Sequence, residues 1–178
     1  MALVGSIGAI ILIGVIVTLP GILGTIPTQS TNGPLRIVNT ISVHSPLAAD
    51  QTATWGEILP QNPTDTPIKI EAIDPINPRG LDVVGISTNN PDVEGGMGFT
   101  RTFPTPGMTL GPVAGAILSP STSASPNLQI LIGVRLSTSS TDGTIDGRRV
   151  RYELGGRTYE LVVPGSLTLT LAPSSPSP

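Results

Sequence analysis

Few residues in this chain have the chemistry needed for catalysis. His44 is the only histidine, and Asp50 is the acidic residue nearest to it in the sequence. A Ser-His-acid site would have to use this histidine as its base, but no nucleophile-elbow pattern accompanies it. We therefore interpret His44 as a surface residue at the end of a strand, and we predict that the protein is not an enzyme.

The segment Asp142-Gly143-Thr144-Ile145-Asp146-Gly147 resembles part of a calcium-binding loop. It contains only two carboxylates and lacks the spacing of an EF-hand, so an ordinary Asp-Gly turn is the better interpretation. The chain has no cysteine, which excludes disulfides, thiol catalysis and zinc–thiolate sites. We predict that the protein binds no metal or cofactor, and no small-molecule substrate is evident.

Arg148, Arg149 and Arg151 form the only cluster of basic residues. It is a candidate partner patch for lipid phosphate or for an acidic protein surface. The alternative is a solvated strand face that Glu153 and Glu160 partly neutralise. The net charge of −3, with 12% charged residues, argues against nucleic acid as a partner.

The dominant feature of the sequence is its uncharged beginning. No charged side chain precedes Arg36, and Leu3 to Leu23 is almost continuously apolar. About 20 apolar residues in a helix span the bilayer core, so we predict a single transmembrane anchor at residues 1–24. Its small residues form two small-xxx-small pairs, which are candidates for close helix packing: Gly5 with Ala9, and Gly14 with Thr18.

Two other interpretations of this run remain open, namely a cleaved signal peptide and a buried helix of a soluble protein. A signal peptide needs a positive n-region, and no Lys or Arg precedes the run. A buried helix of this length rarely lacks charge. We predict a retained single-pass anchor in the cell membrane, with the C-terminal domain outside the cytoplasm. The positive-inside rule does not set this orientation, because basic residues begin only at Arg36.

The rest of the chain has the composition of a β domain. It is rich in Gly and Pro, which number 21 and 19 over the whole chain, and it has β-branched residues between the turns. We predict a linker at 25–34, a β-sandwich at 35–172 and a disordered tail at 173–178. The predicted strands are 35–43, 52–59, 68–73, 81–86, 109–118, 128–136, 148–154, 157–163 and 167–171.

Three turns or loops complete this prediction. His44-Ser45-Pro46 ends the first strand, Ser137 to Gly147 is a polar loop, and Pro164-Gly165 is a turn. Residues 89–107 show no regular pattern. An irregular segment of that length in a compact domain is often functional or mobile.

The hairpin at residues 148–163 is the most explicit local pattern. Gly155-Gly156 suits a two-residue turn with positive φ. That turn places Tyr152 opposite Tyr159 on the core side and Arg151 opposite Glu160 on the exposed side. Alternation, register and charge pairing therefore agree.

Two stretches carry a resemblance to known proteins: Asn-Pro-Thr-Asp-Thr-Pro-Ile-Lys-Ile at 62–70 and Val-Arg-Tyr-Glu-Leu-Gly-Gly-Arg-Thr-Tyr-Glu at 150–160. Together with the single span they resemble uncharacterised exported bacterial proteins with immunoglobulin-like domains, over about residues 35–172. The resemblance implies an all-β, Ig-like antiparallel sandwich. It implies no catalytic site, because its motifs are structural.

These observations predict a non-enzymatic, membrane-anchored accessory or interaction subunit of a larger membrane or envelope complex. Its expected partners are the lipid bilayer and other membrane or envelope proteins. The alternative is a pilin-like subunit of a surface filament, with packed apolar helices and exposed β domains. Pilin-type leaders usually carry a charged segment before the apolar run, and this chain has none.

Overall fold

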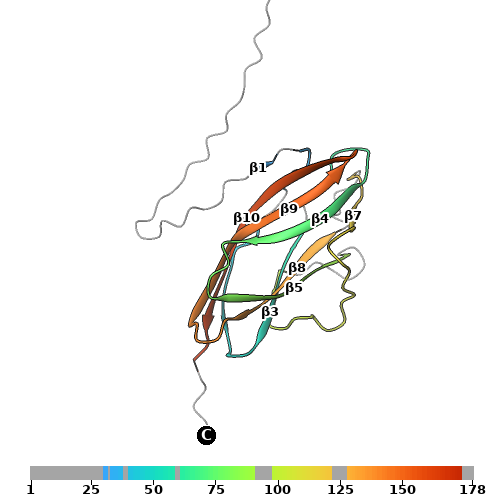
Figure 1. The fold of residues 1–178 in the computed structure, drawn as a ribbon. Helices are drawn as coiled ribbons and strands as arrows, with labels where there is room; N and C mark the ends of the chain where they lie inside the picture. The colour runs from blue at the N-terminus through green and yellow to red at the C-terminus, as the bar shows by residue number, and fades with distance from the viewer. Residues whose placement is uncertain are drawn as a thin grey trace, which may run out of the picture.

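The computed structural model describes residues 30–31, 33–37, 40–58, 61–90, 98–121 and 128–173. These residues form ten strands in two packed sheets (Figure 1). In chain order the strands are β1 (Ser30–Thr31), β2 (Val43–Leu47), β3 (Thr52–Ile58), β4 (Ile68–Ile76), β5 (Leu81–Asn89), β6 (Phe99–Thr100), β7 (Ile117–Leu118), β8 (Gln129–Leu136), β9 (Asp142–Leu154) and β10 (Arg157–Leu171). The prediction of an all-β domain is confirmed for this part of the chain.

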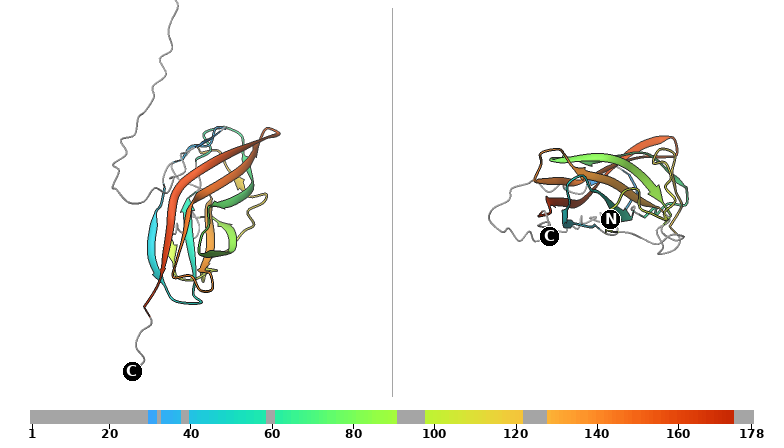
Figure 2. Two further views of the ribbon diagram at one scale, coloured as in Figure 1. Left: turned by 60° about the vertical axis from the view of Figure 1, so that its left-hand side comes forward. Right: turned by 90° about the horizontal axis from the view of Figure 1, so that it is seen from below.

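The larger sheet has the order β1-β10-β9-β4-β7, and β2 also pairs with β10. The smaller sheet has the order β5-β8-β3-β6. Pairing is antiparallel except between β2 and β10, which run parallel. The views in Figure 2 show the two sheets as separate layers, with β10 passing along the full length of the domain.

The core lies between the sheets and is built by alternation along the strands. Ile130, Ile132 and Val134 of β8 are buried in it, and Val150 and Tyr152 of β9 belong to the same core. Such alternation is expected because successive side chains of a strand point to opposite faces. One apolar face of each sheet is therefore removed from water.

The β9–β10 hairpin has the predicted register. Gly155 and Gly156 adopt φ of 60° and 75°, a conformation that costs little only without a β-carbon. Tyr152 pairs with Tyr159, and their rings stack with centroids 5.5 Å apart. Arg151 lies opposite Glu160 in the ladder, which confirms the predicted pairing.

Three predicted breaks in the strands are wrong. His44, Ser45 and Pro46 lie inside β2, where they pair in parallel with β10. The predicted loop at 137–147 is strand from Asp142, because these polar residues pair with the end of β10. β10 continues through the predicted turn at 164–165, since a bulge between Pro164 and Leu167 and a positive φ at Gly165 accommodate it there.

Two predicted strands are much shorter than expected. In the described residues of the range 35–43, the structure has an isolated bridge between Arg36 and Gln61, and β2 begins at Val43. Within 109–118 it has β7 and a single bridge between Gly111 and Thr88. β1 begins inside the range predicted as a linker, and within 89–107 the structure describes 89–90 and 98–107.

Candidate functional site

A buried ion pair joins the two sheets through the core. Arg148 of β9 follows the same alternation as Val150 and Tyr152, so it faces inward. Its guanidinium pairs with the carboxylate of Glu57 on β3, and the two side chains are 1% and 3% exposed. The guanidinium carbon also lies 3.8 Å from the centre of the Trp55 ring, within the range of a cation–π interaction.

Burial sets the electrostatics of this group. Removal from water disfavours the charged form and lowers the pKa of Arg148 to about 9, whereas the carboxylate of Glu57 favours the cation. The Oε1 atom of Glu57 also accepts a hydrogen bond from the backbone N–H of Ile41 at 3.2 Å. The ion pair therefore connects both sheets with the segment that leads into β2, and its role is structural.

The outer face of the smaller sheet is covered by the segment that follows β6. The ring of Phe103 lies over Gly85 of β5 and Gly133 of β8, where a β-carbon would come within 2.7 and 2.3 Å of it. The N–H of Phe103 donates to the hydroxyl of Thr52 at 3.0 Å. Glycine at these two strand positions thus creates the notch that holds the covering segment.

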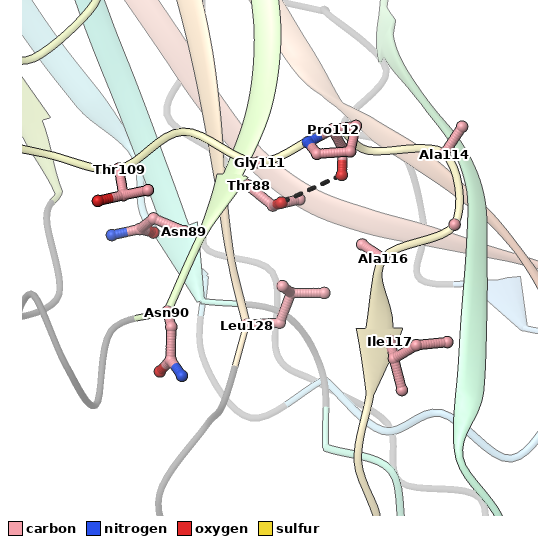
Figure 3. Close-up of a pocket in the computed structure, with 11 residues that line it drawn as sticks. Thr88, Asn89, Asn90, Thr109, Gly111, Pro112, Ala114, Ala116, Ile117 and Leu128 are labelled. Atoms are coloured by element: carbon pink, nitrogen blue, oxygen red, sulfur yellow. Dashed lines mark hydrogen bonds between the residues drawn. The ribbon is translucent and has the colours of Figure 1, made fainter.

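A pocket opens where this covering segment crosses from one sheet to the other. Its volume is about 550 Å³, and Figure 3 shows its residues. The segment pairs with β5 through the backbones of Gly111 and Thr88, whose hydroxyl donates to the carbonyl of Pro112 at 3.2 Å. The lining comes from the end of β5 and the residue after it, the covering segment, β7 and the residue before β8: Thr88, Asn89, Asn90, Thr109, Gly111, Pro112, Ala114, Gly115, Ala116, Ile117 and Leu128.

Asn89 differs from the other lining residues in having a buried side-chain amide without a hydrogen-bond partner among the described residues. It is 4% exposed, yet neither its amide nitrogen nor its amide oxygen has a hydrogen-bond partner among the described residues. Figure 3 shows Thr88 and Asn89 on opposite sides of β5, with Asn89 on the side of Thr109. The sequence analysis missed this pocket. The signal available was a polar run, Ser87-Thr88-Asn89-Asn90, at the end of an apolar strand.

The three arginines predicted as a partner patch do not share a surface. Arg148 is buried, which corrects its place in that patch, while Arg149 and Arg151 are exposed. Arg149 pairs with Glu160 at 3.1 Å and Arg151 with Asp74 at 3.4 Å. The exposed remainder is a salt-bridged strand face, the alternative that the sequence left open.

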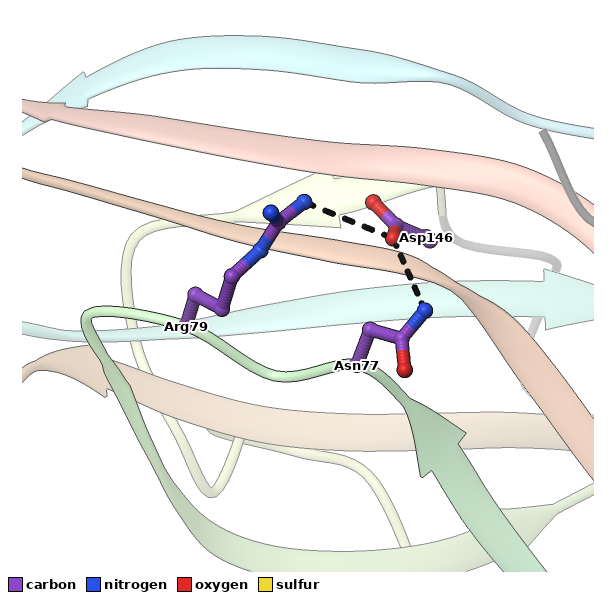
Figure 4. A network of polar contacts seen from close by, with 3 residues as sticks. All are labelled: Asn77, Arg79 and Asp146. Carbon is purple, nitrogen blue, oxygen red and sulfur yellow. Dashed lines mark hydrogen bonds and ion pairs between the residues drawn. The ribbon is translucent and has the colours of Figure 1, made fainter. Parts of the chain in front are cut away.

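The two carboxylates of the calcium-like segment lie on β9. Asp146 accepts a hydrogen bond from Asn77 at 3.2 Å, and its Oδ2 lies 3.5 Å from a guanidinium nitrogen of Arg79 (Figure 4). In the described part of the chain, no three residues of types that ligate metals come together. Asp146 thus contributes to the contact between β9 and the turn after β4.

His44 and Asp50 belong to different elements. His44 is exposed in the middle of β2, opposite Thr168 of β10. Asp50 lies in the turn between β2 and β3 with a φ of 61°. A surface position for His44 agrees with the sequence analysis, although the residue is inside a strand and not at its end.

The predicted helix-packing residues Gly5, Ala9, Gly14 and Thr18 lie outside the described residues, as does the whole predicted anchor. In the part that the structure describes, no helix has the length and apolar character needed to cross a membrane. No protein-family model, curated protein or solved structure matches the chain.

Proposed function

We propose that this protein is a non-enzymatic, membrane-anchored subunit whose β domain binds other proteins outside the cytoplasm, within a larger membrane or envelope complex. One observation carries the proposal. The predicted anchor at residues 1–24 is followed by β1 at Ser30, so only residues 25–29 separate the predicted span from the domain. Five residues reach at most about 18 Å, which would hold the domain at the membrane face.

The way the chain enters the domain supports this arrangement. β1 pairs with β10 at Leu161 and Val162, and β2 pairs with the same strand further along. The backbone of Ile41, between these two strands, is held by Glu57. The domain is therefore joined to the predicted anchor through paired strands, which favours a fixed platform over a freely swinging one.

We further propose that the domain is an immunoglobulin-like sandwich related to exported bacterial proteins of that class. The support is the packing of two mainly antiparallel sheets around one core, with alternating inward residues on β8 and β9. Domains of this architecture commonly serve in binding at cell surfaces. The pocket at the end of β5 offers one candidate surface for such binding.

Membrane fractionation tests the anchor. We expect the full chain to remain in the membrane pellet after washes with high salt and with alkaline carbonate, and to dissolve in detergent. Deletion of residues 1–23 should move the protein to the soluble fraction. A full chain that stays soluble without detergent contradicts the proposal.

Native size after mild detergent extraction separates the proposed role from the filament alternative. An accessory subunit should migrate in a discrete complex of defined size. A sedimenting polymer would instead favour the pilin-like interpretation, in which the pairs formed by Gly5 with Ala9 and Gly14 with Thr18 bring helices together. Substitution of Gly14 by Leu should then disperse the polymer.

A further inference from the structure

The covering segment, residues 101–112, is tied into the sheet ladder at its two ends. β6 directly precedes it and pairs with β3, and Gly111 near its other end pairs with Thr88 of β5. Between these ends the segment crosses the outer face of the smaller sheet. A chain that lies on the face of a sheet cannot extend the ladder, whose hydrogen bonds run between neighbouring strands. Individual side-chain contacts therefore decide how firmly the segment is held.

Two contacts hold the first half of the segment in place. The hydroxyl of Thr54 on β3 donates a hydrogen bond to the carbonyl of Thr102 at 2.5 Å. The ring of Phe103 lies in the notch over Gly85 and Gly133 and is partly buried there. Because burial of an aromatic ring is favourable, the ring stabilises the segment in its closed position.

The sheet surface beneath the segment is polar and opposes this attachment. Gly85, Ser87 and Asn89 alternate along β5 and face the same way, and Figure 3 shows Asn89 on the side of Thr109. Ser87 and Asn89 are 8% and 4% exposed, and the hydroxyl of one and the amide of the other have no hydrogen-bond partner among the described residues. Covering unpaired polar groups costs free energy, and water would restore their hydrogen bonds if the segment lifted.

We infer that the covering segment is a strap that opens and closes over the smaller sheet while the two-sheet core stays folded. The Phe103 ring and the Thr54 hydroxyl favour the closed state, and the hydration of Ser87 and Asn89 favours the open state. No residue of this fully described segment belongs to the core cluster, so opening leaves the core intact. The open state uncovers the glycine notch and the polar residues of β5. This motion does not depend on the proposed membrane anchor.

Limited digestion with trypsin measures the opening, because Arg101 is the only lysine or arginine in residues 80–134. Its carbonyl accepts a hydrogen bond from Gln51 at 3.1 Å, so the protease can bind the backbone only after the segment lifts. Cleavage then follows the population of the open form, provided that closing is faster than cleavage. For the full chain in mild detergent, we expect a cut after Arg101 well before one after Arg151 in β9, with the fluorescence of Trp55 unchanged.

A matched pair of substitutions tests the balance between the two states. Thr54→Val and Ser87→Ala each remove one buried hydroxyl from the outer face of the smaller sheet, but only the hydroxyl of Thr54 bonds to the covering segment in the described structure. We expect Thr54→Val to speed the cut after Arg101 and Ser87→Ala to slow it, each about threefold. Phe103→Ala should speed it about tenfold, because the ring loses its apolar contact in the notch.

Two controls separate strap opening from general loss of stability. Val84→Ala truncates an exposed side chain of β5 and should leave the rate at Arg101 unchanged. The rate of the cut after Arg151 should stay the same in Phe103→Ala. Cuts at Arg101 and Arg151 that change together would show that the segment lifts only on global unfolding, and would overturn the inference. A faster cut in Ser87→Ala, or an unchanged one in Phe103→Ala, would overturn it as well.

Discussion

Two kinds of arginine–carboxylate pair occur within a few residues of each other on β9. Arg148 and Glu57 are buried, with 1% and 3% of their side chains exposed, and Trp55 covers the cation. Arg149 and Glu160 are 48% and 43% exposed on the outer face of the same sheet. The chemical groups are the same in both pairs, but the buried pair has lost its contact with water and its cation lies against Trp55.

That difference changes what each pair contributes. An exposed pair gains little because water and salt screen it, and measured values are about 0–1 kcal/mol. In a buried pair both charges lose hydration, so either partner alone is far less stable than the pair. We therefore expect Arg148 and Glu57 to fix how the sheets align, and the outer pairs to contribute mainly to solubility.

The largest effect should follow from breaking the buried pair. Arg148→Met leaves the carboxylate of Glu57 buried without its cation, so we expect a loss of about 3–5 kcal/mol in the free energy of unfolding. Arg149→Met, the matched change on the exposed face, should cost less than about 1 kcal/mol. Urea unfolding followed by the fluorescence of Trp55, the only tryptophan, measures both.

A double variant distinguishes the loss of packing from the loss of charge compensation. Replacing both partners, as in Glu57→Leu with Arg148→Met, removes both buried charges and should recover most of the stability. If the double variant is as unstable as the single one, the guanidinium contributes through its packing on Trp55 and the comparison between buried and exposed pairs fails.

The next largest loss of stability should come from an aromatic residue that faces the core from β9, as Arg148 does. Tyr152 is fully buried and stacks on Tyr159, so Tyr152→Ala should cost roughly 3 kcal/mol. Arg151→Ala, its neighbour on the exposed face, should cost less than about 1 kcal/mol. Denaturant midpoints of the two variants decide the point. Equal losses would contradict the structure, in which one face of β9 is buried and the other is exposed.

A smaller effect should come from the turn of the hairpin. Gly156 has a φ of 75°, and no atom lies close to where its β-carbon would be. The cost of substitution is therefore conformational, on the order of 1 kcal/mol for Ala and more for a β-branched residue. We expect Gly156→Val to unfold at lower urea than Gly156→Ala. The reverse order would show that backbone strain does not control this turn.

Where the sequence was informative, several local signals agreed. The Gly155-Gly156 turn, the alternation from Val150 to Leu161 and the opposite charges of Arg151 and Glu160 all require one register, and the structure has it. The same alternation already placed Arg148 on the core side with Val150. Grouping it by charge with Arg149 and Arg151 hid that signal.

Other features depend on contacts between distant segments and could not be predicted. β2 is a strand because β10 offers it a parallel partner, although Pro46 argues against one. The pocket forms where Gly111 meets Thr88 and where β7 meets β4, contacts of only one or two residue pairs each. No periodic pattern accompanies such short pairings, so the position of Asn89 required the structure.

The smallest expected effect is on the pH dependence of stability, and it comes from the exposed carboxylate of Asp82. Asp82 accepts hydrogen bonds from Ser137 at 2.6 Å and from Arg135 at 3.1 Å. These two contacts, that of Ser137 first, lower the pKa of Asp82 below its ordinary value of 3.8. Because the folded state then binds the proton less readily than the unfolded state, Asp82 stabilises the fold above pH 3.8, and this contribution is lost as pH falls through the lowered pKa.

Carbon-13 titration of the Asp82 carboxyl in the wild type, Ser137→Ala and Arg135→Met tests which of the two contacts lowers the pKa more. Ser137→Ala should move the midpoint back toward 3.8 by more than Arg135→Met does, because the exposed cation is screened by water while the hydroxyl bond is short. In Asp82→Asn the urea midpoint should change less between pH 5 and pH 2 than in the wild type. A larger change with Arg135→Met would mean that the exposed Arg135 lowers the pKa of Asp82 more than the hydrogen bond from Ser137 does, which would contradict the small contribution expected of exposed ion pairs.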